Sequence, residues 1–442
     1  MPKHFHELRD AIHVFVRYDT DERRIIDSRP FQRLRHIHQL ALTPLVYPGA
    51  THKRFEHSLG VMELAGRVFD VVTQPENVTD QIRNGLPEIS QRDKLAYWRR
   101  VLRMAALCHD IGHLPFSHAA EKELLPAGIS HEDLTRKLIE HAEMKSVWED
   151  MTPPLRPAHI VKLAIGPKKA KDLPFSNWEA ILSEIIIGDA FGVDRMDYLL
   201  RDTYHAGVAY GRFDHYRLID TLRILPTSPA GSSSSSTEPA LGVQEGGLLT
   251  AEALLLARYF MYSQVYFHPV RRIYDVHLQD FMTKHFEGGK YSIEIEDHLR
   301  TTDNEIYAEL SRAANKADHP AHDPARRIVR REHFRVLYQR HPADLKINPD
   351  AGKIIFDAAV AKFGAANVRH DKYSQRGGIA EFPVEARDGR IASSISMSET
   401  LTKLPVVQVE YVFISPDLES QASAWLDANR KELVKPPKED GQ

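Results

Sequence analysis

The stretch LCHDIGHLPFSH, residues 107–118, holds three histidines and an aspartate within ten residues. On a helix predicted from Lys94 to His113, His109 and His113 lie one turn apart, and Asp110 lies three residues before His113. An adjacent His-Asp pair offers a neutral imidazole and an anionic oxygen to one cation. The pair is half of a metal site, so further ligands must come from other segments.

Two other helix-forming segments supply the candidates, His57 in RFEHSLG and Asp194 in GVDRMDY. Apolar residues recur at steps of three and four over 54–72, which predicts a helix with one buried stripe. Each residue taken alone has a simpler interpretation; Asp197 and Arg201, for example, fit a surface pair at i,i+4 spacing. The combination of four potential ligands indicates a metal site.

The composition narrows the class of protein. The chain has 442 residues, 24 histidines, one cysteine and a net charge of −3, which suggests two or three domains. One cysteine excludes a disulfide framework and a Cys-rich zinc module, and fits a reducing cytoplasm. The neutral balance does not indicate nucleic-acid binding. We expect a cytoplasmic protein with no membrane partner, because the sequence has neither an 18-residue apolar run nor a signal peptide.

The pattern along the chain predicts a mainly α fold with a smaller α+β C-terminal portion. We divide it into an N-terminal segment (1–50), a helical core (51–285) and a C-terminal region (286–442), with a flexible Ser-rich insert at 227–240. Further expectations are helices over Phe31–Leu40, His118–Leu125 and Lys353–Phe363, a helix opened by Ser130, short strands at Thr221–Leu225 and Leu241–Gln244, and a strand in VVQVEYVFIS.

Four sequence motifs resemble those of a known family: FQRLRHIHQL, YPGATHKRFEHSLGV, LCHDIGHLPFSH and GVDRMDYLLRD, which span residues 31–202. In this order they resemble the HD-domain deoxynucleoside triphosphate triphosphohydrolases, which include bacterial dGTPase-like enzymes and animal sterile-alpha-motif/HD proteins. The resemblance implies an all-helical HD-domain core. It also implies that the metal is held by His57, His109, Asp110 and Asp194.

The same resemblance implies the other site residues. Around the attacked phosphate it places His113, His118, Glu121 and His131, with Glu121 where the animal enzyme has aspartate. Substrate contacts fall on Gln39, Leu40, Arg54, Arg195, Tyr198, Asp202 and Tyr274. A guanine-nucleotide or deoxynucleotide effector is implied in the N-terminal segment, at Asp27, Gln32 and Arg35, and Arg331 and Arg335 lie one predicted helical turn apart to face its phosphates. For the last two, a solvated basic helix face is the alternative.

The resemblance implies hydrolysis of a deoxynucleoside triphosphate to deoxynucleoside and triphosphate, in a nucleotide-activated homotetramer or dimer. A shell of histidine and carboxylate suits Mn, Fe, Ni, Co or Zn, and Mg²⁺ is expected on the substrate phosphates. Two alternatives stay open. One is a phosphodiesterase or phosphatase for another nucleotide, although the GYP triplet of cyclic-di-nucleotide enzymes is absent. The other is a non-catalytic regulatory oligomer that binds nucleotide or nucleic acid.

Overall fold

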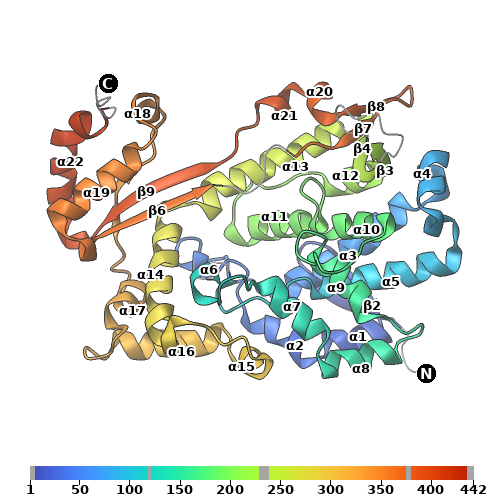
Figure 1. The fold of residues 1–442 in the computed structure, drawn as a ribbon, viewed down its shortest axis with the longest axis horizontal. Coiled ribbons are helices and arrows are strands. Elements are labelled where there is room, and N and C mark those ends of the chain that lie inside the picture. The colour runs from blue at the N-terminus through green and yellow to red at the C-terminus, as the bar shows by residue number, and fades with distance from the viewer. Residues whose placement is uncertain (1–4, 118–120, 228–237, 375–379, 436–442) are drawn as a thin grey trace. The chain divides into compact units, whose positions relative to one another are not determined.

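The computed structural model describes residues 5–117, 121–227, 238–374 and 380–435. These residues form a mainly helical protein with small sheets, as the sequence predicted (Figure 1). The chain divides into two compact units. The first comprises Met1–Met261, Ser292–Asn304 and Gly377–Pro405, and the second comprises Tyr262–Tyr291, Glu305–Arg376 and Val406–Gln442. The three-part division at residues 50 and 285 stays a prediction.

The first unit contains most of the helices. Its elements are β1 (Phe5–Asp10), β2 (Val14–Asp19), α1 (Thr20–Ile26), α2 (Arg29–Gln32), α3 (Arg54–Val72), α4 (Asp80–Gly85), α5 (Arg92–Cys108), α6 (Glu121–Leu124), α7 (His131–Ile139), α8 (Ala142–Asp150), α9 (Pro157–Ile165), α10 (Asn177–Ile187), α11 (Val193–Ala206), α12 (His215–Thr221), β3 (Leu222–Thr227), β4 (Glu238–Gln244), α13 (Leu248–Met261), α15 (Ile295–Arg300), β7 (Pro383–Glu385), β8 (Ile391–Ser393), α20 (Ser394–Met397) and α21 (Glu399–Lys403).

Helix α3 is the centre of this unit and has the bounds that the apolar stripe predicted. Lys53 is the N-cap of this helix. The backbone N–H of Lys53 donates to the Glu56 carboxylate at 2.7 Å, so this amide at the helix start has a partner. Its buried residues pack against α5 and α11. Because α5 carries His109 at its end and α11 carries Asp194 in its first turn, this packing brings the three predicted segments together.

Two helix predictions near the site are wrong in extent. Helix α5 ends at Cys108 instead of His113. The chain turns at Gly112, where a Cβ atom would lie 2.3 Å from the carbonyl oxygen of His131, and no residue with a side chain fits there without displacing α7. Of the helix predicted over His118–Leu125, residues 118–120 lie outside the described residues, and the described part is α6, which ends at Leu124. The helix predicted over 31–40 is α2 followed by a 3₁₀ turn at Arg33–His36.

The helix α7 begins as predicted. Ser130 is its N-cap, and the backbone N–H of Ser130 donates to Asp133 at 2.8 Å, which completes the expected capping box.

The sheets of the first unit were predicted in part. Strands β3 and β4 pair antiparallel, with Leu222 opposite Val243, which confirms the two strands expected on either side of the Ser-rich insert. Residues 228–237 of that insert lie outside the described residues. Strand β7 joins β4 in parallel, and the sheet order is β3-β4-β7-β8. The antiparallel hairpin of β1 and β2 was not predicted, because its residues show no strong apolar alternation.

The burial of Glu184 of α10 against β4 predicts how the stability of the protein depends on pH. Burial raises the pKa of Glu184 to about 7, and its carboxylate accepts a long bond, 3.3 Å, from the Leu241 amide of β4. Between pH 4.5 and 7 the folded protein therefore binds more protons than the unfolded chain, and its stability falls as the pH rises. The amide of Glu184→Gln does not titrate. We expect the variant to gain about 2 kcal/mol relative to the wild type between pH 4.5 and 8.

Urea denaturation across this pH range measures the difference, with Glu238→Gln as the control because Glu238 is an exposed residue of β4. A difference between Glu184→Gln and the wild type that stays constant with pH would contradict the prediction.

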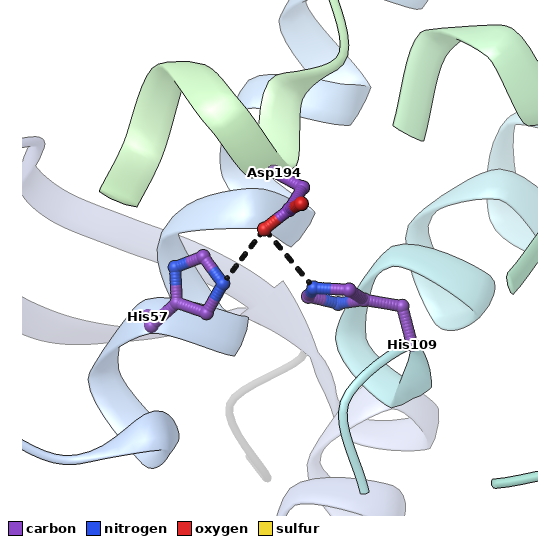
Figure 2. A group of neighbouring side chains, drawn as sticks. All are labelled: His57, His109 and Asp194. Carbon is purple, nitrogen blue, oxygen red and sulfur yellow. Dashed lines mark hydrogen bonds and ion pairs between the residues drawn. The ribbon is translucent and has the colours of Figure 1, made fainter. Parts of the chain in front are cut away.

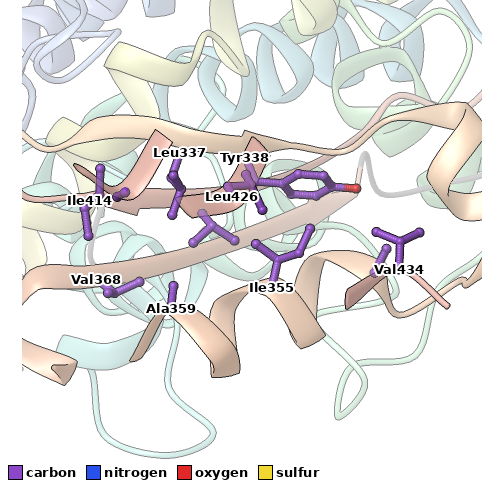
Figure 3. Packing of buried hydrophobic residues seen from close by; sticks show 11 residues of the cluster. Leu337, Tyr338, Ile355, Ala359, Val368, Ile414, Leu426 and Val434 are labelled. Atoms are coloured by element: carbon purple, nitrogen blue, oxygen red, sulfur yellow. The ribbon is translucent and has the colours of Figure 1, made fainter. Parts of the chain in front are cut away.

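The second unit contains α14 (Pro269–His285), α17 (His322–Val329), β5 (Arg335–Gln339), α18 (Pro342–Ile347), α19 (Ala351–Phe363), β6 (Val368–Ser374), β9 (Gln408–Ile414) and α22 (Glu419–Leu433), and α16 (Asp303–Ala314) runs from the first unit into it. The antiparallel sheet has the order β5-β9-β6. Ile355 of α19 and Leu426 of α22 pack with Leu337, Ile414 and Val368 of the sheet (Figure 3). The predicted helix at 353–363 and strand at 406–415 are thus confirmed as α19 and β9.

Within the described residues, no helix combines the length and the apolar character that a membrane crossing needs.

Candidate metal centre

Three side chains from separate helices converge at the centre of the first unit. His57 comes from the first turn of α3, His109 follows α5, and Asp194 comes from the first turn of α11 (Figure 2). The Asp194 Oδ1 atom lies 3.1 Å from Nε2 of His57 and 3.5 Å from Nε2 of His109. Single ligand atoms of the three residues lie within 4.8 Å of one another.

Hydrogen bonds turn both imidazoles toward this point. Nδ1 of His109 donates to the carbonyl oxygen of Ala106 at 2.8 Å, and Nδ1 of His57 donates to the Asp197 carboxylate at 2.8 Å. When each ring is neutral, Nε2 is therefore the atom that carries the lone pair. Nε2 of His109 is buried and has no hydrogen-bond partner among the described residues. A buried nitrogen lone pair beside a carboxylate is the donor set that a divalent transition metal takes, so the residues fit such an ion.

Asp110 adds a second carboxylate. Its Oδ1 lies 3.3 Å from Nε2 of His109, and its Oδ2 lies 3.7 Å from Nε2 of His57 and forms an ion pair with Arg54. Burial alone would raise the pKa of Asp110, but His109 and Arg54 hold this pKa well below its usual range. Asp110 is thus an anionic oxygen at the same place as the three other side chains, and the structure brings together all four residues that were predicted as ligands.

The electrostatics of the cluster favour a cation. Burial lowers the pKa of His57, but its hydrogen bonds to Asp194 and Asp197 raise it to about 10. In the absence of a metal, a proton on His57 therefore supplies positive charge between the two carboxylates. A metal at this point would replace that proton, because only the neutral imidazole is a ligand.

Beside Asp110 lies a second group of polar side chains. The rings of His113 and His131 stack with centroids 3.9 Å apart, and Nε2 of His113 lies 3.2 Å from Asp110. Nδ1 of His131 donates to Glu121 at 2.8 Å. Burial and the cation of Arg54 lower the pKa of His113 well below its usual range, whereas Glu121 outweighs burial and raises the pKa of His131. His118 lies outside the described residues.

The residues predicted to bind substrate differ in their burial and in their hydrogen-bond partners. Leu40 is buried, and the Oε1 atom of Gln39 is buried with no hydrogen-bond partner among the described residues. Arg195 donates to Asp189 at 2.8 Å, and Tyr198 is half-buried on α11. Asp202 is buried and accepts from Nε2 of His52 at 2.7 Å.

The structure corrects the interpretation of Asp197 and Arg201 as a surface pair. Their side chains are 0% and 1% exposed, and Arg201 donates to both carboxylate oxygens of Asp197, at 2.8 and 2.9 Å. Asp197 also accepts from His57, so it contacts a predicted metal ligand. Its place three residues after Asp194, one turn along the same helix face, was the signal in the sequence that could have identified it.

The residues predicted for an effector fall in both units. Asp27 accepts from Arg23, and Gln32 accepts from Arg35, whose guanidinium lies 3.5 Å from the ring centroid of Phe55. Asp27 and Arg35 line an open cavity of about 1220 Å³, together with residues of β1, β2, α1, α3 and α5.

Arg331, Arg335 and Tyr274 belong to the second unit. The helix predicted for Arg331 and Arg335 does not form, because α17 ends at Val329 and Arg331, with φ 59°, turns the chain into β5, where Arg335 is the first residue. Tyr274 is buried in α14, and its hydroxyl lies 3.2 Å from Nδ1 of His333.

Comparison with known proteins agrees with this geometry. A family described as "HD domain" matches residues 54–199, which contain all four predicted ligands, and one described as "HD associated region" matches residues 213–348. The uncharacterized protein YwfO of Bacillus subtilis is 31% identical over 348 residues, which cover 74% of this chain and 71% of that protein. The chain belongs to the HD-domain family of phosphohydrolases.

Other relatives extend the comparison. A hypothetical protein from Aquifex aeolicus of solved structure has a TM-score of 0.77 at 32% identity, and the alignment covers 96% of this chain and 100% of that one. The uncharacterized protein MJ1154 of Methanocaldococcus jannaschii is 36% identical over 65% of this chain. The deoxynucleoside triphosphate triphosphohydrolase SAMHD1 of Gallus gallus is 29% identical over 75% of it. The matches cover only 51% and 56% of these last two proteins, little more than half of each.

Proposed function

We propose that the protein hydrolyses deoxynucleoside triphosphates to deoxynucleoside and triphosphate. The observation that carries the proposal is the convergence of His57, His109, Asp110 and Asp194, with the cation of Arg54 paired to Asp110. The substrate class rests on the similarity to SAMHD1 and on the four sequence motifs described above.

The four residues would hold Mn, Fe, Ni, Co or Zn, which when bound lowers the pKa of a water molecule and polarises a phosphoryl group. Arg54 is buried and offers its remaining N–H groups to phosphate oxygens, and Arg195 is a second cation for the triphosphate. Mg²⁺ would accompany the substrate phosphates. In the proposed reaction the water oxygen bonds to the α-phosphorus, and the bond from that phosphorus to O5′ breaks.

The departing O5′ needs a proton, which we assign to His131. Its Nδ1–H is held by Glu121 at 2.8 Å, and this carboxylate raises the pKa of the ring and so favours its protonated form. His113, stacked on it, has the lowered pKa of a ring that stays neutral. Their surroundings therefore shift the pKa values of the two histidines in opposite directions, as an acid and a neutral hydrogen-bond partner require.

Product chromatography tests the proposal. Purified protein is incubated with Mn²⁺ and each common nucleoside and deoxynucleoside triphosphate. Deoxynucleoside together with tripolyphosphate is the expected result. Nucleoside mono- or diphosphate products would instead favour a phosphatase or phosphodiesterase for another nucleotide. No turnover with any metal would favour a regulatory protein that binds nucleotide or nucleic acid without catalysis.

Glu121→Gln tests the assignment of the acid. Without the carboxylate, the pKa of His131 falls, and a smaller fraction of His131 is protonated at neutral pH. We expect kcat to drop about 10- to 100-fold and the alkaline limb of the pH–rate profile to move to lower pH. Bound metal, measured by atomic emission, should not change. Glu140→Gln is the control, since Glu140 caps the other end of α7. An unchanged kcat in Glu121→Gln would exclude the role of the pair.

We further propose that the cavity lined by Asp27 and Arg35 binds a guanine nucleotide or deoxynucleotide effector. Arginines of α5 and the aromatic ring of Tyr18 also line this cavity. The arginines suit the phosphates of a nucleotide, and the ring suits its base. Binding of a fluorescent GTP analogue to the wild type and to Arg35→Ala tests this proposal. Sedimentation with and without GTP tests the expected homotetramer or dimer. Equal affinity of the two proteins would exclude the cavity as the effector site.

A further inference from the structure

A continuous line of buried contacts leads from the metal centre to the N-terminal hairpin of β1 and β2. We propose that His13, at the tip of this hairpin, is a positioning residue for the metal ligand His57 and acts through Asp197. The inference rests on the metal centre in the proposed function, but it does not depend on the substrate. Every residue in the line belongs to the first unit.

Asp197 is the link between the two histidines. Its Oδ1 accepts from Nε2 of His13 at 2.6 Å and from Arg201 at 2.9 Å, and its Oδ2 accepts from Nδ1 of His57 at 2.8 Å and from Arg201 at 2.8 Å. Four donors occupy the lone-pair positions of one carboxylate, so its rotation is fixed. The fixed Oδ2 in turn fixes the ring plane of His57 and keeps its Nε2 toward Asp194.

The hairpin tip is built to hold His13 against Asp197. Oδ1 of Asp10 accepts from the amides of Ile12 and His13, each at 2.8 Å, and its Oδ2 accepts from Arg201 at 2.8 Å. The next residue, Val14, has a φ of 67°, a left-handed conformation that a β-branched residue rarely adopts. Contacts around the turn therefore hold a strained backbone in place, and the result is that the His13 ring points inward.

The hydrogen bonding of His13 indicates that the residue orients Asp197 and does not merely fill space in the core. The residue is 2% exposed, and its Nδ1 has no hydrogen-bond partner among the described residues. An aromatic or aliphatic side chain would fill this position without burying an unsatisfied nitrogen, so packing alone does not account for a histidine here. What histidine adds is the Nε2–H donor to Asp197. Without that donor, Asp197 loses one of the four hydrogen bonds that fix it, and the orientation of His57 is held less firmly.

Metal affinity is the readout that tests this proposal. Metal-free protein is titrated with Mn²⁺, and free Mn²⁺ is measured by electron paramagnetic resonance. We expect His13→Phe, which keeps a ring but has no donor, to bind Mn²⁺ about 10- to 100-fold more weakly than the wild type. His13→Gln, whose amide nitrogen can take the place of Nε2, should retain most of the affinity. His159→Phe is the matched control, because His159 bonds to Tyr97 away from this line of contacts.

Circular dichroism of each metal-free variant establishes that it is folded. If His13→Phe does not fold, His13→Asn replaces it, because its shorter amide does not reach Asp197; we expect weaker Mn²⁺ binding in His13→Asn than in His13→Gln. Wild-type affinity in folded His13→Phe, equal affinity in the Gln and Asn variants, or no Mn²⁺ binding by the wild type would each overturn the proposal. A wild type that binds Mn²⁺ but does not hydrolyse deoxynucleoside triphosphates would refute the substrate and leave the role of His13 intact.

Discussion

Asp194→Asn is expected to lose bound metal and to lower hydrolysis by about 10³-fold or more. Asp194 lies within 3.5 Å of Nε2 of both His57 and His109, so its carboxylate is the anion that these two imidazoles share. An amide offers a neutral and weaker ligand oxygen in its place, and it does not balance the charge of a divalent ion. Because activated water depends on that ion, binding and turnover should fail together.

Metal content by atomic emission and product formation with Mn²⁺ measure the two effects on one sample. The control is Asp220→Asn, an exposed aspartate in α12 of the same unit. If Asp194→Asn retains both metal and activity, the ligand assignment is wrong. If it retains metal but not activity, Asp194 contacts the reacting groups instead of the ion.

The sequence predicted which segments meet, because the ligand residue types lie in helix-forming segments and in motifs that resemble a known family. His57 and Asp194 each lie in the first turn of a helix, and the apolar stripe of α3 was evident in the sequence. The packing of α3 against α11 brings the two helix starts together. The local course between His109 and His113 was predicted wrongly. Apolar spacing continues past Cys108, whereas the close approach of Gly112 to α7 is a tertiary contact that spacing does not reveal.

Burial of charge was the other part that the sequence could not show. At i,i+4 spacing, Asp197 and Arg201 look the same on a solvated helix as on a buried one. What buries them is the approach of α3 at Gly60, where a Cβ atom would lie 1.9 Å from Oδ1 of Asp197, and the hairpin that brings Asp10 and His13. That hairpin was itself not predicted. The prediction of Arg331 and Arg335 on one helix failed for a related reason, since short-range spacing alone does not distinguish a helix from a turn followed by a strand.

Asp197→Leu is expected to cost about 3–5 kcal/mol of the free energy of unfolding. The substitution removes one of the two carboxylates that contact the buried guanidinium of Arg201 and leaves the N–H donors of His13 and His57 unpaired. Breaking a buried ion pair from one side costs more than the pair contributes, because the remaining charge stays out of water. Burial alone would raise the pKa of Asp197, but Arg201, His13 and His57 hold it well below its usual range, so the carboxylate is charged at neutral pH.

Urea denaturation of metal-free protein at pH 7 isolates this cost from metal binding. Asp70→Leu is the comparison, because Asp70 pairs with Arg99 at 2.6 Å on the surface, where both side chains are about half exposed. An exposed pair of this kind contributes at most about 1 kcal/mol. The double variant Asp197→Leu/Arg201→Met should not recover the loss, because it leaves the buried carboxylate of Asp10 without its cation. Equal losses in Asp197→Leu and Asp70→Leu would mean that water reaches the network, and the fixed orientation of His57 would then need another cause.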